Sequence, residues 1–244
     1  MPENVAQRKK KDNLFRTIIR IILKKSWPYI LNTNNRIRYG ASAPRYGEVI
    51  WVNPRDVSKF VDRQNVVETF GFDSLNMIGI SNAILTSTVI EFGWSNLKTT
   101  SINNVPKIKA CFEHWINGVV WENTGIYEVI EELVKKEGVY DQCENVEDIV
   151  KRYENLDSIF EQTKKEGKFK MSEDGSIEMG YTHIGPGGEP IFGGGAHHRF
   201  AIAYILNIPF PTRLGLVHVS AIPYLDNYRK ERENKSYKVK EMRF

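Results

Sequence analysis

The chain has 244 residues and a formal net charge of +4 at pH 7, and 41% of its residues are hydrophobic. This length is sufficient for one sizeable hydrophobic core with additions, and the composition excludes an intrinsically disordered chain. The two cysteines, Cys111 and Cys143, are 32 positions apart, which excludes a disulfide framework and a zinc ribbon. Because no apolar run is long enough to span a membrane and no secretory signal is recognisable, we expect a cytoplasmic protein, with peripheral membrane association as an alternative.

The first predicted element is a basic amphipathic helix over residues 12–25, which ends at the segment SWPYILN. Its apolar residues recur at helical spacing and are Leu14, Phe15, Ile18, Ile19, Ile22 and Leu23. A basic amphipathic helix suits an anionic membrane surface or nucleic acid, whereas an ordinary surface helix packs its apolar side on the domain, which is the commoner arrangement. We assign residues 1–44 to a basic N-terminal extension.

The middle of the chain is predicted to be mainly helical. A strand over Glu48–Val52 is stopped by Asn53-Pro54, and the mixed pattern of residues 58–100 supports no assignment. The segment VPKIKACFEHWINGVVW predicts a helix with Pro106 in its first turn and Gly118 at its end. Two further helices, GIYEVIEELVKKEG and NVEDIVKRYENLDSIFEQTKKEG, are expected to pack as an antiparallel pair with their charged sides in solvent.

The last third alternates strands and turns around one helix. In SIEMGYTHIG, apolar and polar residues alternate, which predicts a half-buried strand. PGGEP is a turn that leads to a short return strand and so predicts a hairpin. A helix over about 197–206 follows Gly193–Gly195, NIPFP ends it, and TRLGLVHV forms the final strand. The whole pattern predicts an α+β fold with a mixed sheet.

Three glycines followed by His197, His198 and Arg199 form the strongest functional signal in the sequence. The first N–H groups of a helix lack intrahelical partners and favour an anion, and glycines let a phosphate approach the backbone closely. Arg199 can add a charge-assisted pair, and a neighbouring imidazole can donate a hydrogen bond or relay a proton. The pattern therefore predicts a phosphate-binding loop.

Two other interpretations of this region stay open. His183, His197, His198 and His218 lie within 36 positions, and imidazoles suit zinc or iron. Adjacent histidines rarely bind one ion, however, and no nearby carboxylate completes the set, so we predict no metal site built from them. The remaining interpretation is a glycine turn before a buried helix, which is favoured for any single histidine but is weaker for the whole cluster.

The segment FGGGAHHRFAIAYILNIPFPTRLGLVH resembles the strand–loop–helix–strand signature of the ParB/sulfiredoxin-like superfamily. The positions that match the pattern are His198-Arg199, Ala201, Ala203, Ile208-Pro209 and His218. The segments HIGPGGEPIF and EVIWVNPRDV resemble the preceding hairpin and the first strand of that fold, and GVVWENTGIY resembles a Trp-Glu-x-Thr element of some relatives. The resemblance implies a small mixed sheet in a nucleotide-binding domain over 45–220, with a helical insertion at about 104–168 and a charged tail over 221–244.

The resemblance also implies that the loop binds nucleotide phosphates, from ATP, ADP or CTP, together with Mg²⁺. The implied binding residues are Gly193, Gly194, Gly195, Ala196, His198, Arg199 and His218. Two departures narrow the chemistry. His197 stands where sulfiredoxins have their reactive cysteine, which argues against sulfinic-acid reduction. Gly195 stands where the family has Asp, so a carboxylate must come from elsewhere, and Glu178 and Glu189 are the candidates.

The leading hypothesis is a nucleotide-dependent, kinase-like phosphotransferase that acts on a small-molecule or glycan-type alcohol. Phosphoryl transfer consists mostly of positioning and charge neutralisation, and we assign catalytic roles to His197, His198 and Glu178. The alternative is a non-catalytic nucleotide-sensing or DNA-binding protein that uses its basic N-terminal helix. Only 26 residues follow His218, which is too few for the helix-turn-helix module of chromosome-partition proteins.

Overall fold

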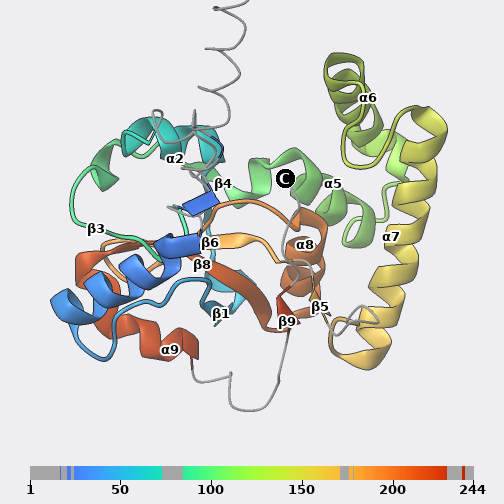
Figure 1. The fold of residues 1–244 in the computed structure, drawn as a ribbon. Coiled ribbons are helices and arrows are strands. Elements are labelled where there is room, and N and C mark those ends of the chain that lie inside the picture. The colour runs from blue at the N-terminus through green and yellow to red at the C-terminus, as the bar shows by residue number, and fades with distance from the viewer. Residues whose placement is uncertain are drawn as a thin grey trace, which may run out of the picture.

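The computed structural model describes residues 17, 21–22, 25–72, 85–170, 176–177, 179–229 and 238–239. These residues form an α+β structure in which an open mixed sheet of seven strands lies beside a group of helices (Figure 1). The α+β class and the mixed sheet are therefore confirmed. Within the described part of the chain, none of the helices combines the length and the apolar character needed to cross a membrane.

The sheet is built around one long central strand. Its strands are β1 (Val49–Val52), β2 (Lys59–Phe60), β3 (Val89–Ile90), β4 (Thr100–Ser101), β6 (Tyr181–Ile184), β7 (Pro190–Phe192) and β8 (Phe210–His218). Their order is β1-β8-β6-β7-β2-β4, and β3 pairs with β8. β8 runs antiparallel to β1 and parallel to β6. The strand predicted at TRLGLVHV is confirmed as part of β8. It is not the final strand, because β9 (Lys238–Val239) follows it and joins β5 (Ser176–Ile177) in a second sheet.

The hairpin of β6 and β7 is confirmed, but the half-buried character of its first strand is not. β6 and β7 pair antiparallel, and the N–H of Gly185 donates to the carbonyl of Glu189 across the turn at 2.9 Å. Thr182, His183 and Ile184 are all buried. Because successive side chains of a strand point to opposite faces of the sheet, this run of buried residues means that both faces of β6 are covered, so alternation in the sequence overestimated its exposure.

The helices mostly begin and end where local signals placed them. They are α2 (Arg63–Thr69), α5 (Pro106–Trp115), α6 (Ile126–Glu137), α7 (Val146–Glu166), α8 (His197–Leu206) and α9 (Leu225–Arg229). Short 3-10 helices cover η1 (Pro54–Asp56), η2 (Trp94–Asn96), η3 (Ile102–Asn104), η4 (Trp121–Thr124) and η5 (Val219–Tyr224). α5 has proline at its first position, and Gly138 and Gly167 end α6 and α7.

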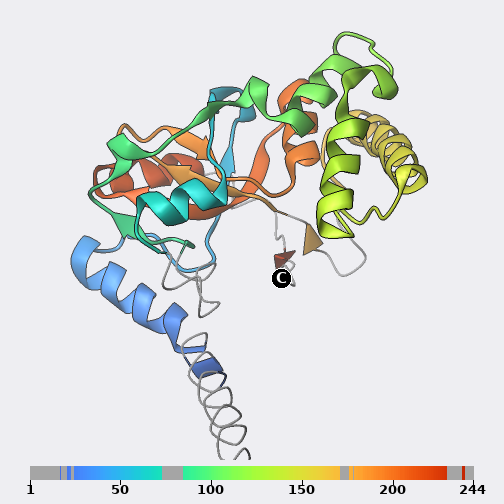
Figure 2. The same ribbon diagram turned by 90° about the horizontal axis from the view of Figure 1, so that it is seen from above.

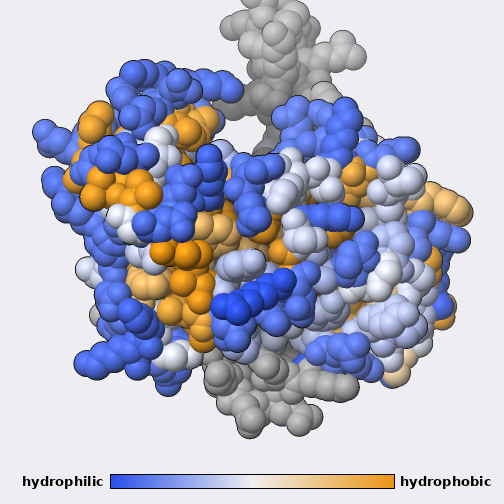
Figure 3. Space-filling view, turned by 180° about the vertical axis from the view of Figure 1, so that it is seen from behind, coloured by the Kyte–Doolittle hydropathy of each residue, from blue (hydrophilic) through white to orange (hydrophobic). Residues whose placement is uncertain are grey.

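α6 and α7 do pack on one another, but they are not the expected antiparallel pair. Figure 2 shows α7 nearly end-on while α6 lies across the view, so the two helices cross at a steep angle. The reason is tertiary, because each helix also contacts α5 or α8 and not only its neighbour in the chain. Hydrophobic atoms reach the surface on the side of the molecule where this helical group lies (Figure 3).

The N-terminal helix extends further than its sequence predicts. SWPYILN was expected to end it, but residues 25–39 are helical without a break. Leu31 and Asn35 are buried on the side that faces the domain, and these contacts outweigh the unfavourable effect of Pro28 inside a helix. Of the predicted amphipathic segment 12–25, only positions 17, 21, 22 and 25 are among the described residues, so its character stays a prediction.

The core places α8 between the sheet and the helical group. Phe200, Ala201, Ile202 and Ala203 of α8 are completely buried, and the ring of Phe200 stacks on Phe192 of β7 at 4.5 Å. The other side of α8 contacts α5 and α7. As a result, the N-terminus of α8 lies against residues from both of these helices.

Candidate functional site

The loop between β7 and α8 reverses the chain and leads directly into the helix. Gly194, Gly195 and Ala196 have φ angles of 89°, 72° and 50°, a left-handed run that glycine adopts readily and alanine rarely. The carbonyl of Gly194 accepts a hydrogen bond from the N–H of Tyr181 at 2.8 Å. No side chain caps α8, so its first turn presents backbone N–H groups, as an anion-binding helix start does.

Two glycines near the loop are required by close packing. A Cβ atom on Gly193 would lie 2.5 Å from Nε2 of His183, and a Cβ atom on Gly180 would lie 2.5 Å from the carbonyl oxygen of Gly195. Both distances are too short for real contacts. Part of the glycine signal in the sequence therefore reflects packing, and only part of it serves the loop conformation.

We expect Gly180→Ala to lower the free energy of unfolding by about 1–3 kcal/mol, because the new methyl group must displace the backbone of the loop. Urea unfolding monitored by fluorescence measures the change. Gly187→Ala is a suitable control, since its Cβ would approach only the movable carboxylate of Glu189, at 3.0 Å. Equal stability of the two variants would show that the loop is not held against Gly180.

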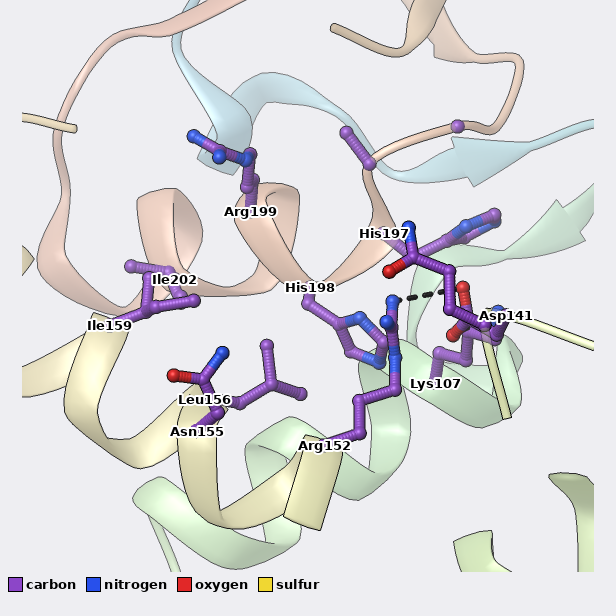
Figure 4. Close-up of a pocket in the computed structure, with 13 residues that line it drawn as sticks. Lys107, Asp141, Arg152, Asn155, Leu156, Ile159, His197, His198, Arg199 and Ile202 are labelled. Carbon is purple, nitrogen blue, oxygen red and sulfur yellow. Dashed lines mark hydrogen bonds and ion pairs between the residues drawn. The ribbon is translucent and has the colours of Figure 1, made fainter. Parts of the chain in front are cut away.

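A cavity of about 370 Å³ opens at the N-terminus of α8 (Figure 4). It is lined by Gly195, Ala196, His197, His198, Arg199 and Ile202 of the loop and α8, by Lys107, Asp141 and Gln142, and by Arg152, Asn155, Leu156 and Ile159 of α7. The charged part of the cavity contains Lys107, Asp141 and Arg152. The apolar part contains Leu156, Ile159 and Ile202, with the amide of Asn155 beside them. Three cations thus share the cavity with a single carboxylate among the described residues.

The charged part is organised around Asp141. One carboxylate oxygen lies 2.9 Å from Nζ of Lys107 and the other lies 2.9 Å from Nη2 of Arg152, which rises from α7 beside His198 (Figure 4). Burial alone would raise the pKa of Asp141, but Lys107 and Arg152 together lower it. The Nε atom of Arg152 is buried and has no hydrogen-bond partner among the residues that the structure describes, so within them this guanidinium retains an unused donor.

The two adjacent histidines are neutral at pH 7. Burial lowers the pKa of His197 to about 4, with a further contribution from Lys107, and its ring packs against Phe60 and Phe192. Burial also lowers the pKa of His198 to about 3, and its Nε2 lies 3.4 Å from the hydroxyl of Tyr153. Neither imidazole is therefore a cation in this structure, and a bound anion would favour their protonated forms.

The other predicted site residues lie elsewhere. His183 is buried in the sheet, where its Nδ1 accepts a hydrogen bond from the N–H of Leu216 at 2.8 Å. His218 contacts Ser220 and the carbonyl of Glu91, and neither it nor Gly193 or Gly194 lines the cavity.

Arg199 lines the cavity, but its side chain points away from Asp141 (Figure 4) and its guanidinium lies over the ring of Phe169 at 5.8 Å. The charge-assisted pair with phosphate that the sequence assigned to Arg199 would therefore require a change in the direction of this side chain. Arg152 and Lys107 are the cations that already face the charged part of the cavity.

Of the two carboxylates proposed from the sequence, the structure describes only Glu189, which does not line the cavity. Glu178 lies outside the described residues. Glu189 is part of the β6–β7 turn, where its carboxylate accepts a hydrogen bond from the N–H of Gly187 at 2.7 Å. Asp141 is the carboxylate that lines the cavity in the described part of the chain, and the sequence interpretation missed it.

Lys107 and Arg152 were also missed, although the sequence contains a signal for one of them. Arg152 lies on the same side of α7 as Ile149, Tyr153 and Leu156, which are buried. A cation at i+3 from one buried residue and i−4 from another is misplaced for a solvated surface and indicates a buried partner. For Asp141 the indication comes only from the structure. Asp141 and its neighbour Gln142 both have positive φ angles, of 55° and 67°, which are uncommon for residues other than glycine.

The described residues contain no group of three or more His, Cys, Asp and Glu side chains that could hold a metal ion. In comparisons of the chain with protein-family models, curated proteins and solved structures, no match is found.

Proposed function

We propose that the protein is a nucleotide-dependent phosphotransferase and that the cavity at the N-terminus of α8 holds the phosphates. The observation that carries this proposal is the set of cations around an uncapped helix start, with Lys107 and Arg152 directed at one acidic residue. Phosphate is the ligand that best matches a helix N-terminus combined with charge-assisted donors. The resemblance to the ParB/sulfiredoxin-like superfamily supports the same choice and stays a prediction.

The two parts of the cavity suit the two parts of a nucleotide. The cations and the backbone N–H groups would bind the phosphates, while Leu156, Ile159 and Ile202 offer an apolar wall for the base or the ribose. The amide of Asn155 is placed beside this wall (Figure 4). The acceptor in this proposal is a small-molecule or glycan-type alcohol.

Asp141 is the carboxylate that we assign to the reaction. In the transfer step, an alcohol oxygen attacks the terminal phosphorus, the bond from that phosphorus to the bridging oxygen breaks, and the alcohol proton passes to Asp141 or His197. Asp141 is ion-paired on both oxygens, so a phosphate that binds Lys107 and Arg152 in its place would release it for this role.

Mg²⁺ fits the cavity only in part. Magnesium prefers carboxylate and phosphate oxygens, and the described lining offers one carboxylate. The residues therefore suit an ion carried by the nucleotide better than a site made by the protein. When bound, Mg²⁺ would supply charge neutralisation on the phosphates.

A specific observation favours a second candidate function. The lowered pKa of Asp141 and those of His197 and His198 make all three groups weak bases, so the cavity also suits nucleotide binding without transfer. A nucleotide-sensing protein would bind the ligand with the same residues and would show no turnover.

Calorimetry with ATP, ADP and CTP, each with and without Mg²⁺, tests the binding step. We expect Arg152→Gln to weaken binding by about tenfold to a hundredfold, because a charge-assisted hydrogen bond is worth about 1.5–3 kcal/mol. Lys151→Gln removes the same charge from an exposed neighbour on α7 and is expected to bind normally. Failure of every nucleotide to bind under both conditions contradicts both candidate functions.

Asp141→Asn separates binding from transfer. The carboxylate of Asp141 is ion-paired with Lys107 and Arg152 and so competes with phosphate for them. Its removal is expected to tighten phosphate binding in the absence of Mg²⁺ by about fivefold, the equivalent of roughly 1 kcal/mol. The same variant is expected to lose nucleotide consumption with alcohol acceptors. Tighter binding with unchanged consumption would remove Asp141 from the reaction, and no consumption by the unmodified protein would favour the sensing function.

A further inference from the structure

One side of the N-terminal helix exposes a row of large apolar side chains. Ile22, Tyr29, Ile30 and Ile37 are 58%, 76%, 52% and 78% exposed. At 100° per residue, these four positions fall within about a third of the helix circumference. Ser26 and the exposed Thr33 interrupt this side of the helix. Large apolar side chains gathered on one exposed side are nevertheless unusual in a folded domain and commonly mark an interaction surface.

The opposite side of this helix is fixed to the domain, so the direction of the apolar row is fixed as well. Leu31 and Asn35 are 5% and 1% exposed. The side-chain amide of Asn35 donates to the carbonyls of Pro44 and Ser87 at 2.9 and 3.1 Å. These contacts turn the apolar row away from the domain, and Figure 2 shows the helix projecting from the body of the molecule.

The charge around the apolar row selects the partner. Residues 13–47 contain no Asp or Glu. Their seven cations are Arg16, Arg20, Lys24, Lys25, Arg36, Arg38 and Arg45. Lys25 and Arg36 are exposed on one flank of the row, and Arg38 is exposed on the other. A side that is both apolar and edged by cations matches a layer of hydrocarbon covered by anionic headgroups.

Other partners would match either the apolar row or the cations beside it, but not both. A second copy of the chain could cover the apolar side chains but would bring cations against cations without an acidic residue in the segment to neutralise them. Nucleic acid would neutralise the cations but would leave the isoleucines in contact with water, since its backbone binds mainly through charge. An anionic bilayer buries the apolar row and neutralises its flanks at the same time.

We propose that the N-terminal helix docks the protein on the surface of anionic lipid bilayers, with Ile22, Tyr29, Ile30 and Ile37 inserted among the headgroups and the helix lying in the plane of the surface. The proposal is independent of the chemistry in the cavity. It places the phosphotransfer site, if the proposed function holds, within reach of acceptors at a membrane.

Flotation of the full chain with vesicles tests the docking. We expect the protein to float with vesicles that contain phosphatidylserine and phosphatidylcholine at low salt, and to bind pure phosphatidylcholine at least about tenfold less well, because each cation near an anionic surface contributes about 1 kcal/mol. Raising the salt concentration should weaken the binding, since exposed charges are screened.

Two variants and a matched control identify the surface. The double variant Ile30→Ser and Ile37→Ser is expected to bind anionic vesicles at least about tenfold less well, because two apolar side chains no longer insert. Arg36→Gln is expected to bind about fivefold less well. Phe92→Ser changes a side chain with the same 78% exposure as Ile37 at another place, and its binding should be unchanged.

Several outcomes would overturn the proposal. These are no flotation with anionic vesicles, equal binding to neutral vesicles, or equal loss of binding in Phe92→Ser and in the double variant. A dimer in sedimentation velocity that the double variant dissociates, without vesicle binding, would assign the surface to a second copy. Retention on DNA that depends on Arg36 but not on Ile30 and Ile37 would assign it to nucleic acid.

Discussion

The free energy of unfolding is expected to fall by about 3 kcal/mol through His183 alone as the pH is lowered from 6.5 to 4. Burial in the sheet lowers the pKa of His183 from an ordinary value of 6.5 to about 4. Its Nδ1 accepts a hydrogen bond from Leu216, and its ring fills the space beside Gly193 and Gly215. Protonation would break that hydrogen bond and place a charge in the core.

The direction of this effect follows from proton binding in the two states. Below pH 6.5 the unfolded chain protonates His183 while the folded protein does not, so its contribution is complete above that pH and is lost progressively toward pH 4. A tenfold change in a proton-binding constant is worth about 1.4 kcal/mol, which gives the magnitude. His197 and His198 act in the same direction because burial also lowers their pKa values.

Urea unfolding at pH 7.0, 5.5 and 4.5 measures this dependence. His183→Asn keeps a hydrogen-bond acceptor that does not titrate, so we expect the variant to be less stable at pH 7 but to lose less stability on acidification. His218→Asn is the control, since His218 is only half-buried and lies at the end of β8. A variant at position 183 with the full acid dependence would show that another group is responsible.

Asp157→Ala is expected to lower the free energy of unfolding by about 2–4 kcal/mol. The carboxylate of Asp157 accepts hydrogen bonds from the indole N–H groups of Trp115 and Trp121 at 2.8 and 3.0 Å. Nε2 of His114 lies 3.0 Å from the same carboxylate. A hydrogen bond to a charged group contributes about 1.5–3 kcal/mol when it is buried. Because the side chain of Asp157 is 41% exposed, screening by solvent reduces the total for the two indole hydrogen bonds to about 2–4 kcal/mol.

Asp157→Ala is also expected to affect nucleotide binding in the cavity at the N-terminus of α8. Asp157 connects α7 to α5 and to η4. Arg152 belongs to α7 and Lys107 belongs to α5. Loosening the connection should weaken nucleotide binding in Asp157→Ala, and Asp157→Asn should show a smaller effect because its amide retains one acceptor oxygen.

Urea unfolding measures the stability of the Asp157 variants, and calorimetry with ATP measures their binding. Glu154→Ala, an exposed change on the same helix, should alter stability by less than about 0.5 kcal/mol. Unchanged stability in Asp157→Ala would contradict the structural role of this carboxylate.

Several features of the fold could be predicted because their causes are local. Pro106 at the start of α5, Asn145 before α7 and Gly167 after it act within a few residues. The β6–β7 turn and the start of α8 at His197 were predictable for the same reason. The region 58–100 was not, because β2 pairs with the distant β7 as well as with β4, and β3 pairs with the distant β8.

Part of the candidate site could likewise be predicted from adjacent residues, and part of it could not. The run from Gly195 to Arg199 was identified from the sequence, since its glycines and the helix that follows are adjacent in the chain. Lys107, Asp141 and Arg152 come from three separate segments. In the sequence Lys107 and Asp141 look like ordinary charged residues, and only Arg152 carries a signal, its place among the buried residues of α7. Their shared role depends on how α5 and α7 pack on α8, which no spacing reports.

The sequence by itself determined approximately where α5, α6, α7 and α8 begin and end, that strands and helices are mixed, and which loop presents backbone N–H groups at a helix start. Those properties depend on caps, turns and periodicity, which act over a few residues. Only the tertiary structure decided that His183 is a core residue, that His218 lies apart from the cavity, and that Asp141 forms ion pairs with the cations of the cavity. Burial and ion pairing join residues distant in the chain, so they exist only once the helices have packed.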